Sequence, residues 1–332
     1  MQKKKVLLLT YGNRNHASSR IRALNHFDRL KDVYEATWIP RVSADHKGGF
    51  MNKLVFAIIK RFDAIKLWWT LWFGTFDIAF VQVRFLPEWA LKVLKRKKTL
   101  LCYDFDDAVY TYSARDFELM MKYSDKVVVS TPYLKEHIES FKKECCVIFS
   151  PVNTNLILPL SNRQPVYTIG WIGSEWTIPY LQELVPVFKR FAESISIRLI
   201  VVGAEFNIPG VDVECIAWSE KNELDALGKI DVGIMPLKND EWSKMKGGYK
   251  LYLYMAAGRP SIASPYGINA DIIIAGGTGY FAQNEDEWLN AFEKLQNDLV
   301  LRRSMGLLAR QEAEKKYSYN VCTQQLVDFL NS

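Results

Sequence analysis

The chain of 332 residues is long enough for two domains, each with a full hydrophobic core. Hydrophobic residues make up 49% and charged residues 24%, which is the balance of a folded globular protein and excludes a disordered chain. The formal net charge of +6 is too mild to indicate nucleic-acid binding, and no helix-turn-helix, zinc-finger or RNA-binding signature accompanies it.

The first predicted element is a buried strand, KVLLLT at residues 5–10, which breaks at residues 11–13 before a helical pattern over residues 17–30. A strand, a glycine turn and a helix in this order open a doubly wound α/β sheet, which binds ligands at the carboxyl ends of its strands. Polar residues crowd the turn, and Arg20 and Arg22 can each offer paired donors to a phosphate or carboxylate. A solvated helix face is the alternative interpretation.

Residues 33–39 predict a second strand, and residues 50–76 are amphipathic at helical spacing. A core helix is one interpretation of residues 50–76. The other is an interfacial helix that docks on anionic lipid. The second is favoured by an aromatic cluster at the end of the segment and by basic residues within it: Trp68, Trp69, Trp72, Phe73 and Phe76, with Lys53, Lys60, Arg61 and Lys66.

The chain shows no signal peptide, and its longest apolar run is far short of the ~20 residues that span a bilayer. The five cysteines are odd in number and have no CxxC spacing, which is typical of reduced structural residues. We therefore expect a cytoplasmic protein, with peripheral contact at the inner face of the cell membrane if residues 50–76 dock on lipid.

Two further strands are predicted at residues 77–83 and 99–103, and three carboxylates follow the second of them directly: Asp104, Asp106 and Asp107. The carboxyl end of a buried strand is where open α/β sheets bind ligands, and neighbouring like charges raise the pKa of one member. A general base, a group that orients an acceptor hydroxyl and a metal ligand are all open as roles. A helix N-cap cluster is the alternative to a site.

Strands at residues 126–130 and 146–149 complete the first half, and the proline-bounded stretch 150–165 predicts an interdomain linker. The second half restarts with a strand at 167–172 and a turn at 173–177, whose Gly173 lets a phosphate approach and whose Ser174 and Thr177 hydroxyls can donate to it. Strands at 197–202 and 212–217 end at Gly203 and Trp218.

Residues 230–268 carry the strongest pattern of the chain: a strand at 230–236, a loop with Lys246, Gly247 and Gly248, a helix at 249–257 and a strand at 261–264. Lys246 and Lys250 are four residues apart, which predicts one face at the start of the helix. With the two glycines and the positive end of the helix, they predict an anion site. An ordinary βαβ unit with solvated lysines is the alternative.

Several segments resemble the nucleotide-sugar glycosyltransferases of family four: DVGIMPL at 231–237, YMAAG at 254–258, SPYGIN at 264–269, IGWIGS at 169–174 and MGLLARQEAEKKYS at 305–318. The resemblance covers the second half well and the first half loosely, where DFDDA at 104–108 is similar to a segment of one sub-branch. It implies the GT-B fold, α/β with two doubly wound Rossmann-like domains that face a central cleft. The expected domains are an acceptor-side domain at 1–155, a donor-binding domain at 156–317 and a C-terminal helix at 318–332 that crosses back.

The resemblance also implies roles for the candidate residues. The donor would contact Gly173, Ser174, Trp176, Thr177, Gly203, Trp218, Gly247, Gly248 and Tyr249. The acceptor would contact Gly12, His16, Ser19, Arg20 and Arg22. The candidate catalytic residues are Asp106, Asp107, Lys246 and Lys250, and the two lysines compensate the charge of the leaving phosphate.

The implied activity is a retaining hexosyl transfer from a nucleotide sugar, UDP- or GDP-linked, to a lipid-linked glycan in cell-surface polysaccharide biosynthesis, with no cofactor and no metal. The chain departs from the family at Met245 and Leu253, where many members carry a glutamate pair, and residues 174–177 hold no cation. A nucleotide-sugar-binding protein without turnover and a sugar-nucleotide epimerase on the same scaffold are therefore the alternatives.

Overall fold

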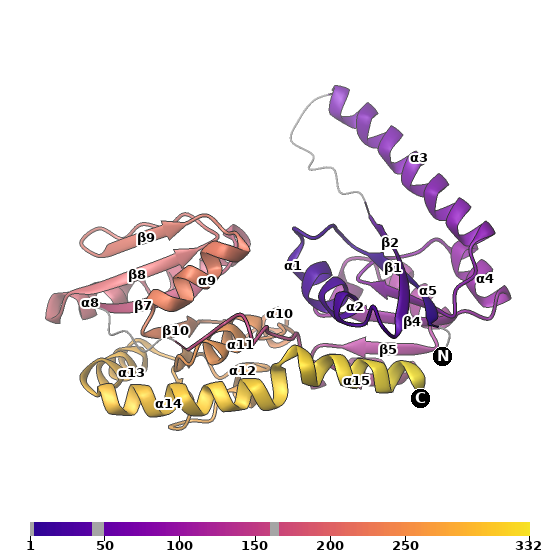
Figure 1. Ribbon diagram of the computed structural model, residues 1–332. Helices are drawn as coiled ribbons and strands as arrows, with labels where there is room; N and C mark the ends of the chain where they lie inside the picture. The colour runs from indigo at the N-terminus through magenta and orange to yellow at the C-terminus, as the bar shows by residue number, and fades with distance from the viewer. Residues whose placement is uncertain (1–2, 42–49, 160–165) are drawn as a thin grey trace. The chain divides into compact units, whose positions relative to one another are not determined.

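The computed structural model describes residues 3–41, 50–159 and 166–332, and for residues 50–60 the backbone alone. The chain divides into two units (Figure 1). Unit 1 comprises Met1–Ser150 with Thr323–Ser332, and unit 2 comprises Pro151–Cys322. Each unit is an α/β structure built on a six-stranded sheet in which all described strand pairs are parallel.

The sheet of unit 1 has the order β2-β1-β3-β4-β5-β6. Its strands are β1 (Lys4–Thr10), β2 (Tyr34–Pro40), β3 (Ile78–Gln82), β4 (Leu100–Phe105), β5 (Lys126–Val129) and β6 (Glu144–Val147). The central strands β3, β4 and β5 are buried along almost their whole length, which is why they consist of apolar runs in the sequence. The order of the strands reverses between β1 and β3, and such a switch point is where open sheets bind ligands.

The helices of unit 1 follow the predicted pattern with local differences. They are α1 (Ala17–Ser19), a π-helical turn (Arg20–Leu24), α2 (Asn25–Arg29), α3 (Phe50–Phe73), α4 (Glu88–Arg96), a 3₁₀ turn (Val109–Thr111), α5 (Ala114–Tyr123) and α6 (Pro132–Glu139). The helix predicted at 17–30 is thus found, but in its middle the Asn25 N–H reaches the carbonyl of Arg20, five residues back. None of the described helices is long and apolar enough to cross a membrane.

The sheet of unit 2 has the order β12-β11-β10-β7-β8-β9, and it reverses between β7 and β10. Its strands are β7 (Tyr167–Ile172), β8 (Ile197–Val202), β9 (Asp212–Ile216), β10 (Val232–Met235), β11 (Ser261–Ala263) and β12 (Gly279–Phe281). Its helices are a 3₁₀ turn (Glu175–Thr177), α7 (Ile178–Gln182), α8 (Val185–Ser194), α9 (Glu220–Lys229), α10 (Glu241–Lys244), α11 (Tyr249–Ala256), α12 (Asn269–Ile272), α13 (Glu285–Asn297), α14 (Leu299–Glu312) and a π-helical turn (Ala313–Tyr317).

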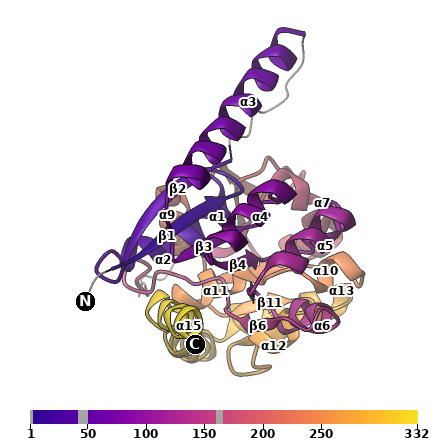
Figure 2. The same cartoon turned by 90° about the vertical axis from the view of Figure 1, so that its right-hand side faces the viewer.

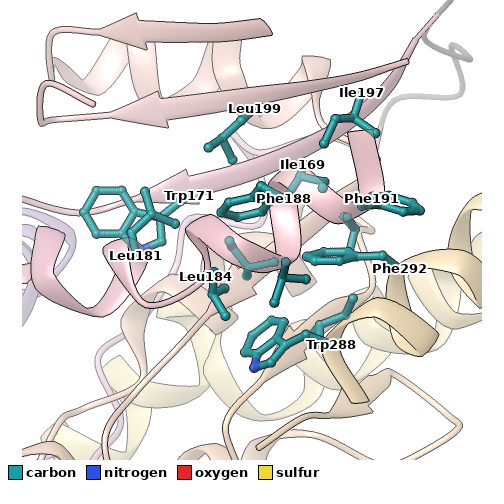
Figure 3. Packing of buried hydrophobic residues seen from close by; sticks show 14 of the residues in the cluster. Ile169, Trp171, Leu181, Leu184, Phe188, Phe191, Ile197, Leu199, Trp288 and Phe292 are labelled. Atoms are coloured by element: carbon teal, nitrogen blue, oxygen red, sulfur yellow. The ribbon is translucent and has the colours of Figure 1, made fainter. Parts of the chain in front are cut away.

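Aromatic and aliphatic side chains pack together in the core of unit 2, between its sheet and the helices α8 and α13 (Figure 3). The ring of Phe292 stacks on Phe191 with the centroids 5.5 Å apart and lies 6.0 Å from Phe188. All three rings are buried, and burial of each stabilises the fold by about 1.5–3 kcal/mol. Trp171 of β7 belongs to the same cluster, so this core also fixes the strand that ends at the candidate site.

The last helix, α15 (Tyr319–Asn331), begins in unit 2 and ends in unit 1. His26 Nδ1 lies 2.7 Å from Thr323 Oγ1, and Lys126 Nζ donates to the carbonyl of Phe329 at 2.7 Å. Residues 151–159 of the expected linker group with unit 2, where the Arg310 guanidinium donates to the carbonyls of Thr154 and Ile157. The five cysteines are all free.

Candidate active site

The two loops that follow β7 and β8 touch through their backbones. The Gly173 N–H donates to the Val202 carbonyl at 2.9 Å, and Gly203 has a φ of +88°. A Cβ atom at Gly203 would lie 2.2 Å from the Gly173 carbonyl oxygen, so this position requires glycine. The same Cβ would lie 3.4 Å from the Cβ of Trp218, so the structure brings Gly173, Gly203 and Trp218 together.

The polar residues of the 173–177 turn are partly engaged by the turn itself. Thr177 Oγ1 accepts the Ser174 N–H at 3.1 Å and donates to the Ser174 carbonyl at 3.0 Å. The Thr177 hydroxyl proton is therefore used within the turn, and its predicted donation to a phosphate would require that hydrogen bond to break. Trp176 is 92% exposed, and the Trp218 indole N–H donates to Glu223 at 2.9 Å.

Helix α11 begins directly after Gly248, which has a φ of +71° and packs against α12. The helix is anchored by the Tyr254 hydroxyl, which accepts the Ile172 N–H at the end of β7 at 3.1 Å. Lys250 lies in the first turn of α11, whereas Lys246 precedes the helix in the segment between α10 and α11. The prediction that the two lysines share a helix face is therefore wrong, because Lys246 is not helical.

The two lysines are nevertheless neighbours, and aromatic rings surround them. Lys250 Nζ lies 4.1 Å from the ring centroid of Trp171, and Lys246 Nζ lies 5.3 Å from that of Trp242 and 6.0 Å from that of Tyr180. Among the described residues, neither lysine forms an ion pair with a carboxylate. The three aromatic partners were not among the residues predicted from the sequence.

Burial, followed by the positive charge of Lys246, lowers the pKa of Lys250 to about 7. Two ammonium groups close together without a carboxylate are unfavourable, and an anion between them would remove that cost. The lysines follow β10 and Gly173 follows β7, the two strands that flank the switch point of this sheet. The arrangement therefore suits a phosphate group held by cations and by the first N–H groups of α11.

Unit 1 has a hydrogen-bond chain at its own switch point, between β1 and β3. Gly12 N–H donates to Ser19 Oγ at 3.0 Å, and Ser19 Oγ donates to Gln82 Oε1 at 2.9 Å. Gln82 Nε2 donates to Ser18 Oγ at 2.7 Å, and Ser18 Oγ donates to Asp106 at 2.6 Å. These hydrogen bonds join the predicted residues Gly12, Ser19 and Asp106 with Gln82, which was not predicted although it lies near the end of the strand expected at residues 77–83.

Arg22 has a different place from the one predicted. It is buried and binds the buried carboxylate of Asp104 through Nε at 3.0 Å and Nη2 at 2.6 Å, while Nη1 donates to the Ile148 carbonyl at 2.9 Å. The prediction of Arg22 as an acceptor-binding residue is corrected on this ground, since all three nitrogens serve the fold of unit 1. Burial raises the pKa of Asp104 to about 6 against the effect of Arg22, and Asp106 adds only a smaller increase.

Of the remaining candidates in unit 1, His16 interacts electrostatically with Asp106. The rings of His16 and Tyr11 lie 5.0 Å apart, and burial lowers the pKa of His16, opposed by Asp106. Burial, and then the charges of Asp107 and Asp106, raises the pKa of Tyr112 to about 12. Arg20 donates to the carbonyl of Arg14. No group of three metal-ligating side chains is present among the described residues.

Comparisons with known proteins bear on the fold and on the second unit. Residues 166–298 match the family model described as "Glycosyl transferases group 1". Sucrose-phosphate synthase from Thermosynechococcus elongatus is similar in structure, with a TM-score of 0.74 at 13% identity over 98% of each chain. Anabaena Alr3699/HepE in complex with UDP and glucose has a TM-score of 0.71 at 12% identity over 99% of each chain. No curated protein matches the sequence. The chain thus has the GT-B fold of glycosyltransferases, and a segment of its second unit matches the group 1 glycosyl transferases.

Proposed function

We propose that the protein is a glycosyltransferase that takes its sugar from a nucleotide-sugar donor, with the diphosphate held in unit 2 by Lys246 and Lys250. The observation that carries this proposal is the pair of adjacent ammonium groups without a carboxylate partner among the described residues, beside the start of α11. Both lysines lie inside the segment that matches the group 1 glycosyl transferases.

A uridine or guanosine diphosphate sugar is the donor that we propose. Related structures support uridine, since Alr3699/HepE was solved with UDP-glucose and the pneumococcal O-GlcNAc transferase GtfA with UDP and GlcNAc. The backbone of Gly173 and Gly203 is the proposed contact of the donor phosphates, and Trp218, which is about one third exposed, is the proposed contact of the nucleoside. Ser174, Trp176, Gly247, Gly248 and Tyr249 complete the proposed donor contacts.

The chemistry follows from this charge arrangement. In transfer, the bond between the sugar C1 and the phosphate oxygen breaks, a bond from C1 to an acceptor oxygen forms, and the acceptor hydroxyl loses its proton. Negative charge develops on the leaving diphosphate, and the two lysines stabilise it without a metal ion. Asp106 and Asp107 are the proposed groups that orient the acceptor hydroxyl or take its proton. Gly12, His16, Ser19 and Arg20 are the proposed acceptor contacts.

The finer proposal is a retaining hexosyl transfer to a lipid-linked glycan in cell-surface polysaccharide biosynthesis, by a cytoplasmic protein at the membrane. One observation favours the alternatives of a binding protein without turnover or an epimerase. Leu253 is buried and Met245 is a thioether, so neither position supplies a carboxylate to a donor sugar.

A transfer assay separates these functions. UDP- and GDP-sugars are incubated with and without a lipid-linked glycan acceptor, and nucleotide release and the sugar products are measured. A transferase releases nucleotide and labels the acceptor. A binding protein shifts in thermal stability without turnover, and an epimerase alters the sugar with no acceptor present. Loss of transfer in Lys246→Ala and Lys250→Ala, with Lys244→Ala unaffected, supports the proposed donor site, and full transfer in both variants contradicts it.

A further inference from the structure

Helix α3 carries an apolar face that is turned away from the body of unit 1. Leu67 and Leu71 are buried and define the face that packs on the unit. On the opposite side lie Phe62, Ile65, Trp69 and Phe73, which are 68%, 59%, 60% and 60% exposed. Their spacing of three and four residues places them in one stripe along the helix. Both views show α3 extending away from the sheet of its unit (Figures 1 and 2).

The aromatic rings of this face pack on one another. Trp69 and Phe73 lie 4.4 Å apart between ring centroids, and Trp68 stacks on Trp72 at 5.6 Å. Trp72 and Trp68 border the stripe and are themselves 54% and 42% exposed. We call these six residues, Phe62, Ile65, Trp68, Trp69, Trp72 and Phe73, the aromatic face. A contiguous exposed apolar surface of this kind marks a site of interaction.

The charges around the aromatic face are positive. Arg61 and Lys66 are exposed and flank the stripe on either side. The single acidic residue between positions 61 and 73 is Asp63, which is mostly buried and forms an ion pair with Arg84 at 3.3 Å. The exposed side of this helical segment therefore presents aromatic rings and cations with no carboxylate.

We propose that the aromatic face is a membrane-docking surface, and that it seats in the interface of a bilayer that contains anionic lipid. Trp and Phe rings are favoured at the boundary between headgroups and acyl chains, and flanking Lys and Arg side chains are attracted to anionic headgroups. The helix does not qualify as a membrane span, so it would lie in the plane of the interface. The inference deepens the proposed function, because it supplies the membrane contact that a lipid-linked acceptor needs.

Vesicle flotation of the full chain tests this inference. The parent protein should float with phosphatidylcholine vesicles that contain phosphatidylglycerol, and added salt should weaken binding because exposed charges are screened. Trp69→Ser and Phe73→Ser should each lower the partition coefficient about tenfold. Arg61→Glu with Lys66→Glu should remove the preference for anionic vesicles. Leu307→Ser is the matched control, since Leu307 is a 63% exposed apolar residue on α14, and it should float like the parent.

Three outcomes overturn the inference. In the first, the parent does not bind anionic vesicles. In the second, the Trp69→Ser and Phe73→Ser variants bind as well as the parent. In the third, the parent is a dimer in solution that these variants convert to a monomer, which means that a second copy covers the aromatic face. Equal melting temperatures of parent and variants show that the substitutions leave the fold intact. Because the readout is lipid binding and not sugar transfer, the membrane surface and the proposed donor site can fail separately.

Discussion

Replacing Lys250 with methionine should abolish a pH dependence of nucleotide-sugar binding. The Lys250 ammonium lies over the ring of Trp171 beside Lys246, and burial with this second charge lowers its pKa to about 7. A bound diphosphate favours the protonated ammonium and raises this pKa toward its usual value. Binding is therefore coupled to proton uptake, and the dissociation constant should rise by up to about tenfold for each pH unit above about 7.

Calorimetric titration with UDP-glucose measures this coupling, because its diphosphate does not titrate in this pH range. Titrations in buffers of different ionisation enthalpy report the protons taken up on binding. Lys250→Met should bind more weakly at about pH 7 and show a flat pH profile, whereas Lys244→Met, whose native ammonium pairs with Glu241, should keep the slope of the parent. A flat profile in the parent, or an unchanged slope in Lys250→Met, would refute the reasoning.

Three further predictions concern the fold that positions the site. Burial lowers the pKa of His26 to about 3, whereas in the unfolded chain His26 takes up a proton near pH 6.5. The free energy of unfolding should therefore fall as the pH drops below about 6.5, by about 2 kcal/mol at pH 5. Urea unfolding measures this loss, and His26→Gln should remove it. Arg22→Met leaves the buried Asp104 carboxylate without its cation and should lower the free energy of unfolding by roughly 3–5 kcal/mol, with partial recovery in Arg22→Met/Asp104→Leu. Gly203→Ala places a Cβ against the Gly173 carbonyl oxygen and should lower both the melting temperature and the affinity for nucleotide. Unchanged values would show that the loops after β7 and β8 can move apart without loss of stability.

The fold was largely predictable because buried parallel strands are continuous apolar runs. The strand predicted at residues 167–172 matches β7, and the strand predicted at 33–39 is found one residue later as β2. The helix predicted at 249–257 ends one residue earlier, before Gly258 with its φ of +66°. The spatial order of the strands could not be predicted from the sequence, because it depends on pairing between distant segments. The switch points that place Gly12 and Gly173 emerged only from the structure.

The candidate site was predicted in part, and the errors have a common physical origin. Charged residues that follow buried strands indicate a ligand site, but Arg22 and Asp104 satisfy each other across 82 positions in sequence, which no local pattern reveals. Trp171 was interpreted as a strand residue of the core. Its contact with Lys250 depends on β7 and β10 being neighbours, so neither this contact nor the burial that lowers the pKa of the lysine could be predicted from the sequence.

The most direct test of the central claim is a calorimetric titration of UDP and GDP, free and as sugar conjugates, into the parent, Lys246→Ala, Lys250→Ala and the control Lys244→Ala. We expect that one nucleotide binds the parent, that each lysine variant loses about 1.5–3 kcal/mol of binding free energy, and that the control binds like the parent. Equal affinity in the parent and in both lysine variants would contradict it, since the diphosphate would then lie elsewhere.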